Sequence, residues 1–253
     1  HVDAVTFLGA HVVPAGADAA AYLDLVTGPM LQAVAPSVSA VDVFCETGAF
    51  DEAATRRVLE SARAAGLATR VHGNQLGHGP GVQLAVEYGS RSVDHLGFVT
   101  DADVAALAAS WTNGRRGTVA TVLPACDLST RMPLAPARAL LDAGAVLAIA
   151  SNANPGTSFT TSMNFAVTTA VLQMRLSVAE AVRAATLGGA IALGMYRDGW
   201  VDPRGVAHPR AGAIEVGARA DLQLLDAPSA THLAYRPGVP LTAAVWRAGQ
   251  RLV

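Results

Sequence analysis

The sequence contains no lysine, and charged residues of any kind are scarce. All 18 basic residues are arginine, charged residues make up 15% of the 253 positions, and the net charge is −2. We interpret the absence of lysine as codon bias in a GC-rich bacterium. A near-neutral chain with so few charges lacks the basic surface that nucleic-acid binding requires, so we expect no nucleic-acid partner.

Cysteine and long apolar runs are also scarce. Two cysteines, Cys45 and Cys126, are too few for a disulfide framework, and reduced cysteines are typical of the cytoplasm. No apolar run reaches the roughly 18 residues that a membrane-spanning helix needs, and no signal peptide is recognisable. We therefore expect a cytoplasmic protein without a membrane partner.

The sequence does contain a repeated alternation of short apolar runs and longer helical stretches. Hydrophobic residues make up 51% of the chain, enough for a sizeable core. Six β-rich runs, such as AVDVFCE and VLAIASN, alternate with Ala- and Leu-rich stretches of helical period, which is typical of βα units on a parallel sheet. Helices are expected over residues 18–34, 51–65, 80–89, 101–110 and 135–143.

The pattern changes after residue 154. Residues 160–195 predict two helices, with Ser177 as an N-cap and Glu180 at the capping-box position. Residues 198–211 are rich in Gly, Pro and Arg and predict a loop, and the short alternating runs that follow predict β-strands. We therefore expect a catalytic barrel part over residues 1–197 and a C-terminal β appendage over residues 198–253.

Polar residues stand at the ends of five predicted strands. They are His11, Glu46, His72, His95 and Asn152. In a (β/α)8 barrel the carboxyl ends of the strands face the active site. Each residue taken singly is explained as well by a polar strand end, but five at the same relative position indicate a shared site. His72 and His95, on consecutive strands, are of the type that binds a divalent cation.

Eight stretches carry a resemblance to a known family. They are TFLGAHVVP, VDVFCETGAF, VHGNQLGHGPGVQLAVEYG, SVDHL, VATVLP, NPGTSFTTSM, GARADLQLLDAP and HLAYRPGVP. In this order and spacing they resemble imidazolonepropionases, which are amidohydrolase-superfamily enzymes of histidine degradation. The resemblance implies an α/β fold of the metal-dependent-hydrolase type. This is a (β/α)8 TIM-type barrel, here with about six βα units and a small C-terminal β appendage.

The resemblance also implies a metal site. His72 would be a metal ligand, and His95 would transfer protons near the metal-bound water. The family carries an aspartate where Asn152 stands. An amide offers a carbonyl oxygen but no negative charge, and it is a poor base. The implied cofactor is one divalent ion, zinc or iron.

The same resemblance implies substrate contacts. His11 would contact the substrate, and Gln75 would contact its imidazolone ring. Asn154, Gly156 and Thr157 would form the loop that holds the substrate or the ring-opened product.

The first barrel strand of the family carries two more metal ligands in the pattern His-x-His. No two histidines of this chain are separated by one residue. The six predicted strands match the third to eighth strands of the family barrel, so we expect the N-terminal third of that fold to be absent. Metal binding by this chain alone is then expected to be weak or absent. Two open sheet edges, together with the resemblance, lead us to expect a homodimer.

The implied reaction opens the ring of 4-imidazolone-5-propanoate to N-formimidoyl-L-glutamate, and the missing ligands leave the activity of this chain open. Two alternatives remain. The chain could be a non-catalytic or divergent amidohydrolase paralogue that binds a small carboxylated ligand, or an amidohydrolase that acts on another cyclic amide.

Overall fold

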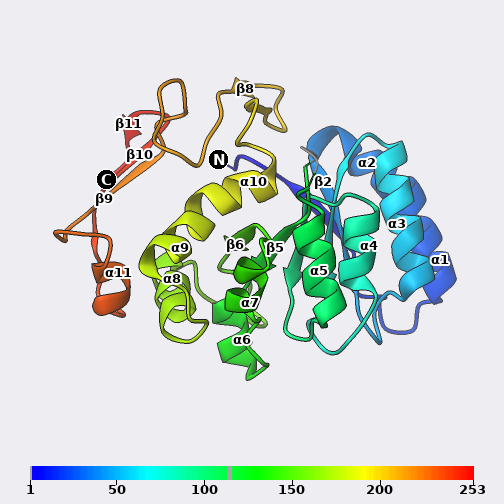
Figure 1. Cartoon of the computed structure of the whole chain (residues 1–253). Helices are drawn as coiled ribbons and strands as arrows, with labels where there is room; N and C mark the ends of the chain where they lie inside the picture. Colours follow the sequence, from blue (N-terminus) through cyan, green and yellow to red (C-terminus); the bar gives the residue numbers. More distant parts are fainter. Residues whose placement is uncertain (1, 113–115) are drawn as a thin grey trace.

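The six predicted strands form one parallel sheet (Figure 1). In the computed structural model, which describes residues 2–112 and 116–253, the order of the strands in the sheet is their order along the chain. The strands are β1 (Thr6–Ala10), β2 (Ala40–Cys45), β3 (Ala68–Gly73), β4 (Ser92–His95), β5 (Val119–Val122) and β6 (Leu147–Ile149). The α/β fold with six βα units, part of a (β/α)8 barrel, is therefore confirmed. β1 and β6 are the edges, and each pairs with one described strand.

Helices connect successive strands, as expected from the alternation. They are α1 (Ala19–Leu25), a π-helical turn (Val26–Met30), α2 (Leu31–Val34), a 3-10 turn (Ala35–Ser37), α3 (Glu52–Ala64), α4 (Gly81–Glu87), α5 (Asp101–Ala109), α6 (Pro124–Thr130) and α7 (Ala137–Asp142). Every helix expected between the strands is present. The first is interrupted by its π-helical turn at Pro29, and the short helix α6 was not predicted.

Local sequence explains where these helices begin and end, and α3 is the clearest case. The side chain of Asp51 accepts a hydrogen bond from the Ala54 amide at 2.8 Å, which caps the first turn. Gly66 stands just beyond the last turn with a φ of +73°, a conformation that glycine adopts at little cost. Val58 and Leu59 are buried on the face of α3 that packs against the sheet.

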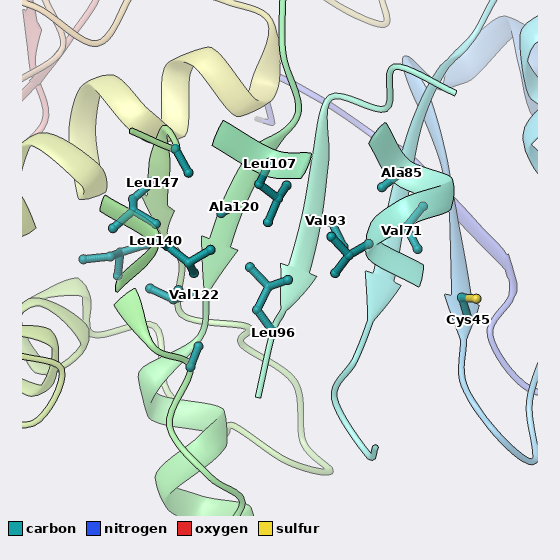
Figure 2. Close-up of a cluster of buried hydrophobic side chains, with 14 of the residues drawn as sticks. Cys45, Val71, Ala85, Val93, Leu96, Leu107, Ala120, Val122, Leu140 and Leu147 are labelled. Atoms are coloured by element: carbon teal, nitrogen blue, oxygen red, sulfur yellow. The ribbon is translucent and has the colours of Figure 1, made fainter. Parts of the chain in front are cut away.

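The core lies between the strands and the helices that cover one face of the sheet (Figure 2). Strand valines meet aliphatic side chains from α4, α5 and α7, and all of them are fully buried. They are Val71, Val93 and Val122 from the strands, and Ala85, Leu107 and Leu140 from the helices. The opposite face of the same strands is polar, because Asp42 pairs in register with Arg70, and His72 with Asp94. This polar face is the interior of the partial barrel.

The remaining chain forms four α-helices, a π-helical turn and five short strands. The elements are α8 (Met163–Leu172), α9 (Val178–Arg183), a π-helical turn (Ala184–Gly188), α10 (Gly189–Leu193), β7 (Trp200–Val201), β8 (Ala207–His208), β9 (Leu222–Leu225), α11 (His232–Tyr235), β10 (Thr242–Arg247) and β11 (Gln250–Arg251). The capping box of Ser177 and Glu180 at the start of α9 is confirmed.

One expectation about this part was wrong. Residues 198–211 are not only a loop, because β7 and β8 form an antiparallel pair within them. The β appendage contains a three-stranded sheet with the order β11-β10-β9. Asp3, near the amino terminus, accepts hydrogen bonds from Arg219 and Arg247 of this part, both at 2.8 Å. The division at residues 197 and 198 stays a prediction. No described helix has the length and apolar character to cross a membrane.

Candidate active site

The carboxyl end of the sheet, here called the mouth, brings three predicted histidines together. His11 follows β1, His72 lies in β3, and His95 is the last residue of β4. The ring centroid of His72 lies 4.6 Å from that of His11 and 5.1 Å from that of His95. Parallel strands end at the same edge of a sheet, so residues 61 and 23 positions away from His72 become its neighbours.

Asp42 holds the central ring. Its Oδ1 atom lies 2.9 Å from Nδ1 of His72 and 3.7 Å from Nε2 of His11, and the side chain is 4% exposed. Burial lowers the pKa of His72, but the charge and hydrogen bond of Asp42 outweigh burial and raise that pKa to about 9. Burial raises the pKa of Asp42, but the two histidines outweigh it and hold that pKa well below its usual range. Each partner therefore stabilises the charged form of the other.

His95 has the opposite protonation. It is 2% exposed, and its Nδ1 atom has no hydrogen-bond partner among the described residues. Burial lowers the pKa of His95 to about 3, and the positive charge of His72 acts in the same direction. His95 is therefore a neutral imidazole that can accept a proton.

The backbone at the end of β4 is unusual. His95 has a φ of 83° and Leu96 a φ of 68°, both in the left-handed region that non-glycine residues seldom adopt. Asp94 points to the barrel interior by the alternation of the strand, so its neighbour His95 would otherwise point toward the helices. This local conformation accompanies the approach of the His95 ring to His72, and backbone strain of this kind clusters at functional sites.

Gln75 and Glu46 meet beside the histidines. The Oε1 atom of Glu46 accepts a hydrogen bond from the Gln75 amide at 2.6 Å, which fixes the backbone of the loop after β3. Burial raises the pKa of the Glu46 carboxyl. The side chain of Gln75 is half-buried, so this loop offers an amide group close to the mouth.

The predicted substrate loop after β6 is closed on itself. The Asn154 side chain donates to the carbonyl of Asn152 at 2.7 Å and to the hydroxyl of Thr157 at 2.9 Å. Its Oδ1 atom accepts from the amides of Gly156 and Thr157 at 2.9 and 2.8 Å. Asn152 has a φ of 50° and makes no hydrogen bond to the three histidines in the part of the chain that the structure describes.

Two groups of side chains have the composition of a metal site. The ligand atoms of His11, Asp42 and His72 lie within 4.8 Å of one another, as do those of His95, Cys126 and Asp127. Burial raises the pKa of Asp127 to about 7. Imidazole, carboxylate and thiolate are the usual ligands of zinc, so the mouth contains the donor atoms that a divalent cation needs.

Sequence reasoning missed three of these acids. Asp42 and Asp94 lie inside apolar strands, and Asp127 lies in the short helix α6. Burying a carboxylate in a strand lowers the stability of the fold unless a hydrogen-bond or ion-pair partner compensates for the lost hydration. An aspartate inside an apolar strand is visible in AVDVFC and SVDH. The partner of Asp42, however, lies on β3, and the pairing of β2 with β3 joins residues that are distant in the sequence.

Comparison with known proteins gives consistent results. The sequence profile of the amidohydrolase family matches residues 45–251. The chain is 66% identical over 253 residues to the imidazolonepropionase of Arthrobacter sp. (strain FB24), covering 98% of this chain and 62% of that protein. It is 62% identical to the imidazolonepropionase of Paenarthrobacter aurescens (strain TC1), covering 100% of this chain and 62% of that protein. The chain thus spans less than two thirds of the length of these relatives.

A solved structure supports the fold. An adenosine deaminase from Xanthomonas campestris, determined with bound zinc, superposes with a TM-score of 0.69 at 24% identity. The match covers 96% of this chain and 59% of the deaminase. At this identity the likeness concerns the barrel fold. The resemblance inferred from the sequence motifs is confirmed by the curated relatives.

Proposed function

Because the chain belongs to the amidohydrolase family, we propose that it performs the imidazolonepropionase reaction. In this reaction water adds to the ring carbonyl carbon of 4-imidazolone-5-propanoate, the bond from that carbon to its ring nitrogen breaks, and the nitrogen takes a proton. The product is N-formimidoyl-L-glutamate. Identities of 66% and 62% to imidazolonepropionases favour this reaction over another cyclic amide and over a non-catalytic role.

One structural observation carries the proposal. The ring of His72, held by Asp42 at 2.9 Å, lies with its centroid 5.1 Å from that of the buried His95, whose Nδ1 atom forms no hydrogen bond among the described residues. Hydrolysis of an amide needs a group that accepts a proton from water and returns it to the leaving nitrogen. For this transfer His95 offers a buried imidazole nitrogen without a partner in the described structure, while Asp42 fixes the orientation of the neighbouring ring.

The same residues fit one divalent metal ion, zinc or iron. The buried Nε2 of His11 and Nδ1 of His95 have no hydrogen-bond partner among the described residues, and Nδ1 of His72 is held by a carboxylate. A carboxylate on one ring nitrogen orients the other nitrogen toward a metal, an arrangement common in zinc sites. We propose His72 and Asn152 as ligands from this chain. A bound cation would polarise the substrate carbonyl and lower the pKa of water.

The other proposed roles concern substrate contacts. His11 lies beside His72 at the mouth, and Gln75 lies on the loop that Glu46 fixes, so both are close to the space in front of the metal ligands. The substrate loop is formed by Asn154, Gly156 and Thr157. Its internal hydrogen bonds give it one defined shape, which suits the recognition of a small polar molecule.

Assembly and location are also proposals. We propose a homodimer, because β1 and β6 each have one paired neighbour in the described structure and leave hydrogen-bonding edges. Size-exclusion chromatography with light scattering tests it, and a monodisperse monomer would contradict it. A cytoplasmic location agrees with two free cysteines and stays a prediction.

The function is tested by following the loss of 4-imidazolone-5-propanoate in the presence of zinc or ferrous ion. Because metal binding by this chain alone is expected to be weak, the metal is added in excess. We then expect turnover by the chain, and a loss of about 100-fold or more in kcat for His95→Gln, the range typical of a general acid–base. His78→Gln is the matched control, because His78 is exposed on the loop after β3 and contacts Phe98 edge-on. Binding of the substrate without product, in the wild-type chain, would contradict the proposal.

A further inference from the structure

A cavity lies at the amino ends of the strands, at the opposite edge of the sheet from the mouth. Its volume is about 530 Å³, and its walls include Ala68 at the start of β3, Arg91 before β4, Gly117 before β5 and Val146 before β6. Tyr196, which follows α10, contributes another wall. Small-molecule sites commonly have volumes of about 300–1,000 Å³. The amino end of such a barrel ordinarily serves stability, so a cavity of this size there requires an explanation.

The cavity is lined by positive charge. Arg63, Arg91, Arg116 and Arg197 line it, and no aspartate or glutamate is among its described lining residues. Arg116 pairs with Asp198 at 3.3 Å. The other three arginines form no ion pair with a carboxylate in the described ranges. Three like charges without paired carboxylates raise the free energy of the empty cavity, and an anion would lower it.

Arg91 is the most enclosed of the four. Burial lowers the pKa of its guanidinium, and the positive charges of Arg70 and Arg116 act in the same direction. Its Nη1 atom donates to the carbonyl of Leu193 at 2.9 Å. A guanidinium carries five N–H donors in a planar fork, so this single bond leaves donors that match two oxygens of a phosphate or carboxylate.

Aromatic rings share the lining with these arginines. Tyr88, Trp111 and Tyr196 contribute to it. The guanidinium groups of Arg56 and Arg63 lie 5.8 and 5.9 Å from the centre of the Tyr88 ring, so Trp111 and Tyr196 are the rings available to a ligand. The Trp111 indole donates to the carbonyl of Thr118 at 3.1 Å, which fixes its plane. Fixed rings beside guanidinium groups form stacking surfaces for a flat, electron-rich ring.

These features define a ligand class. We propose that the cavity binds an aromatic phosphate, of which a nucleoside monophosphate is the simplest natural type, at a site separate from the mouth. The phosphate would lie between Arg91 and Arg197, because a dianion balances two guanidinium charges whereas a single carboxylate balances one. The base would lie against the aromatic rings. The site does not depend on the hydrolase reaction.

Calorimetric titration of the 253-residue chain with adenosine monophosphate tests this proposal. We expect saturable binding, at least about tenfold tighter than the binding of adenosine or of inorganic phosphate, because the ring and the anion are recognised together. The affinity should fall as salt is added. Equal affinity for adenosine monophosphate and adenosine would contradict the role of the arginines, and equal affinity for inorganic phosphate would contradict the role of the rings.

Arginine variants locate the site. Arg197→Gln alters an exposed side chain and should keep the fold, while weakening adenosine monophosphate binding about tenfold. Arg91→Gln should weaken it further. Arg251→Gln, near the carboxyl terminus, is the matched control and should bind like the wild type. His95→Gln should also bind normally, which separates this site from the mouth. Unchanged affinity in Arg197→Gln and Arg91→Gln would overturn the proposal.

Discussion

The two sides of the mouth differ in how their polar atoms are satisfied. On the histidine side, formed by His11, Asp42, His72 and His95, one carboxylate oxygen lies close to two rings. Nε2 of His11, at 3.7 Å from that oxygen, and Nδ1 of His95 form no hydrogen bond among the described residues. On the amide side, formed by residues 151–158, the Asn154 side-chain amide makes five hydrogen bonds within its own loop. The histidine side therefore has polar atoms without hydrogen bonds to described residues, whereas the polar atoms of the Asn154 side chain are all hydrogen-bonded.

This difference indicates where chemistry takes place. A buried nitrogen without a partner costs free energy, so such atoms persist where an external group completes them. A loop whose amide is satisfied internally contributes shape and little reactivity. The mouth therefore combines a charged, strained side that can act on a substrate with a neutral side that can position it.

The largest difference in stability between the two sides of the mouth is expected when Asp42 is replaced. Asp42→Ala would leave the His72 imidazole buried without its partner, and we expect the free energy of unfolding to fall by about 3 kcal/mol, as for other broken buried pairs. Asn152→Ala, at the same end of the sheet, should cost about 1 kcal/mol or less. Urea denaturation of both variants at pH 7 gives the two values. Equal losses would mean that the two sides do not differ as described.

Most of the fold could be predicted from the sequence because its signals are local. The strands are short β-rich runs, and the helices carry caps such as Asp51 and the Ser177–Glu180 box. The helix α6 was missed because the seven residues PACDLST show no apolar period and begin with proline. The pair β7–β8 was missed because strands of two residues carry no alternation.

The site could be predicted only in part. The histidines were found because they end consecutive strands, and a parallel sheet brings such positions together. Asp42 was missed because its role depends on register, which places it opposite Arg70, two residues before His72 on the same face of β3. The turn of His95 toward His72 accompanies positive φ angles, and no propensity of histidine or leucine predicts them.

A second, smaller effect is expected on the amide side. Asn154→Ala removes five hydrogen bonds in a partly exposed loop. We expect a loss of about 2 kcal/mol in the free energy of unfolding. The amides of Gly156 and Thr157 should exchange their hydrogens faster, because both donate to Asn154 Oδ1. Hydrogen exchange by mass spectrometry measures this, with Asn152→Ala as the control. Unchanged exchange in Asn154→Ala would show that the backbone alone holds the loop.

The smallest effect is expected from a substitution that gives the amide side a carboxylate, as the histidine side already has. Asn152→Asp places a carboxylate at the end of β6, and we expect the affinity for zinc to rise about fivefold, or about 1 kcal/mol, because a negative charge attracts the cation through partly solvated space. Metal retained after dialysis measures the change without any assay of turnover. The gain should vanish in the double variant Asn152→Asp, His72→Gln, since the new carboxylate acts together with that ring. If the gain in zinc affinity persists without His72, the added metal binds at another place. If Asn152→Asp gives no gain, the end of β6 is not at the metal position.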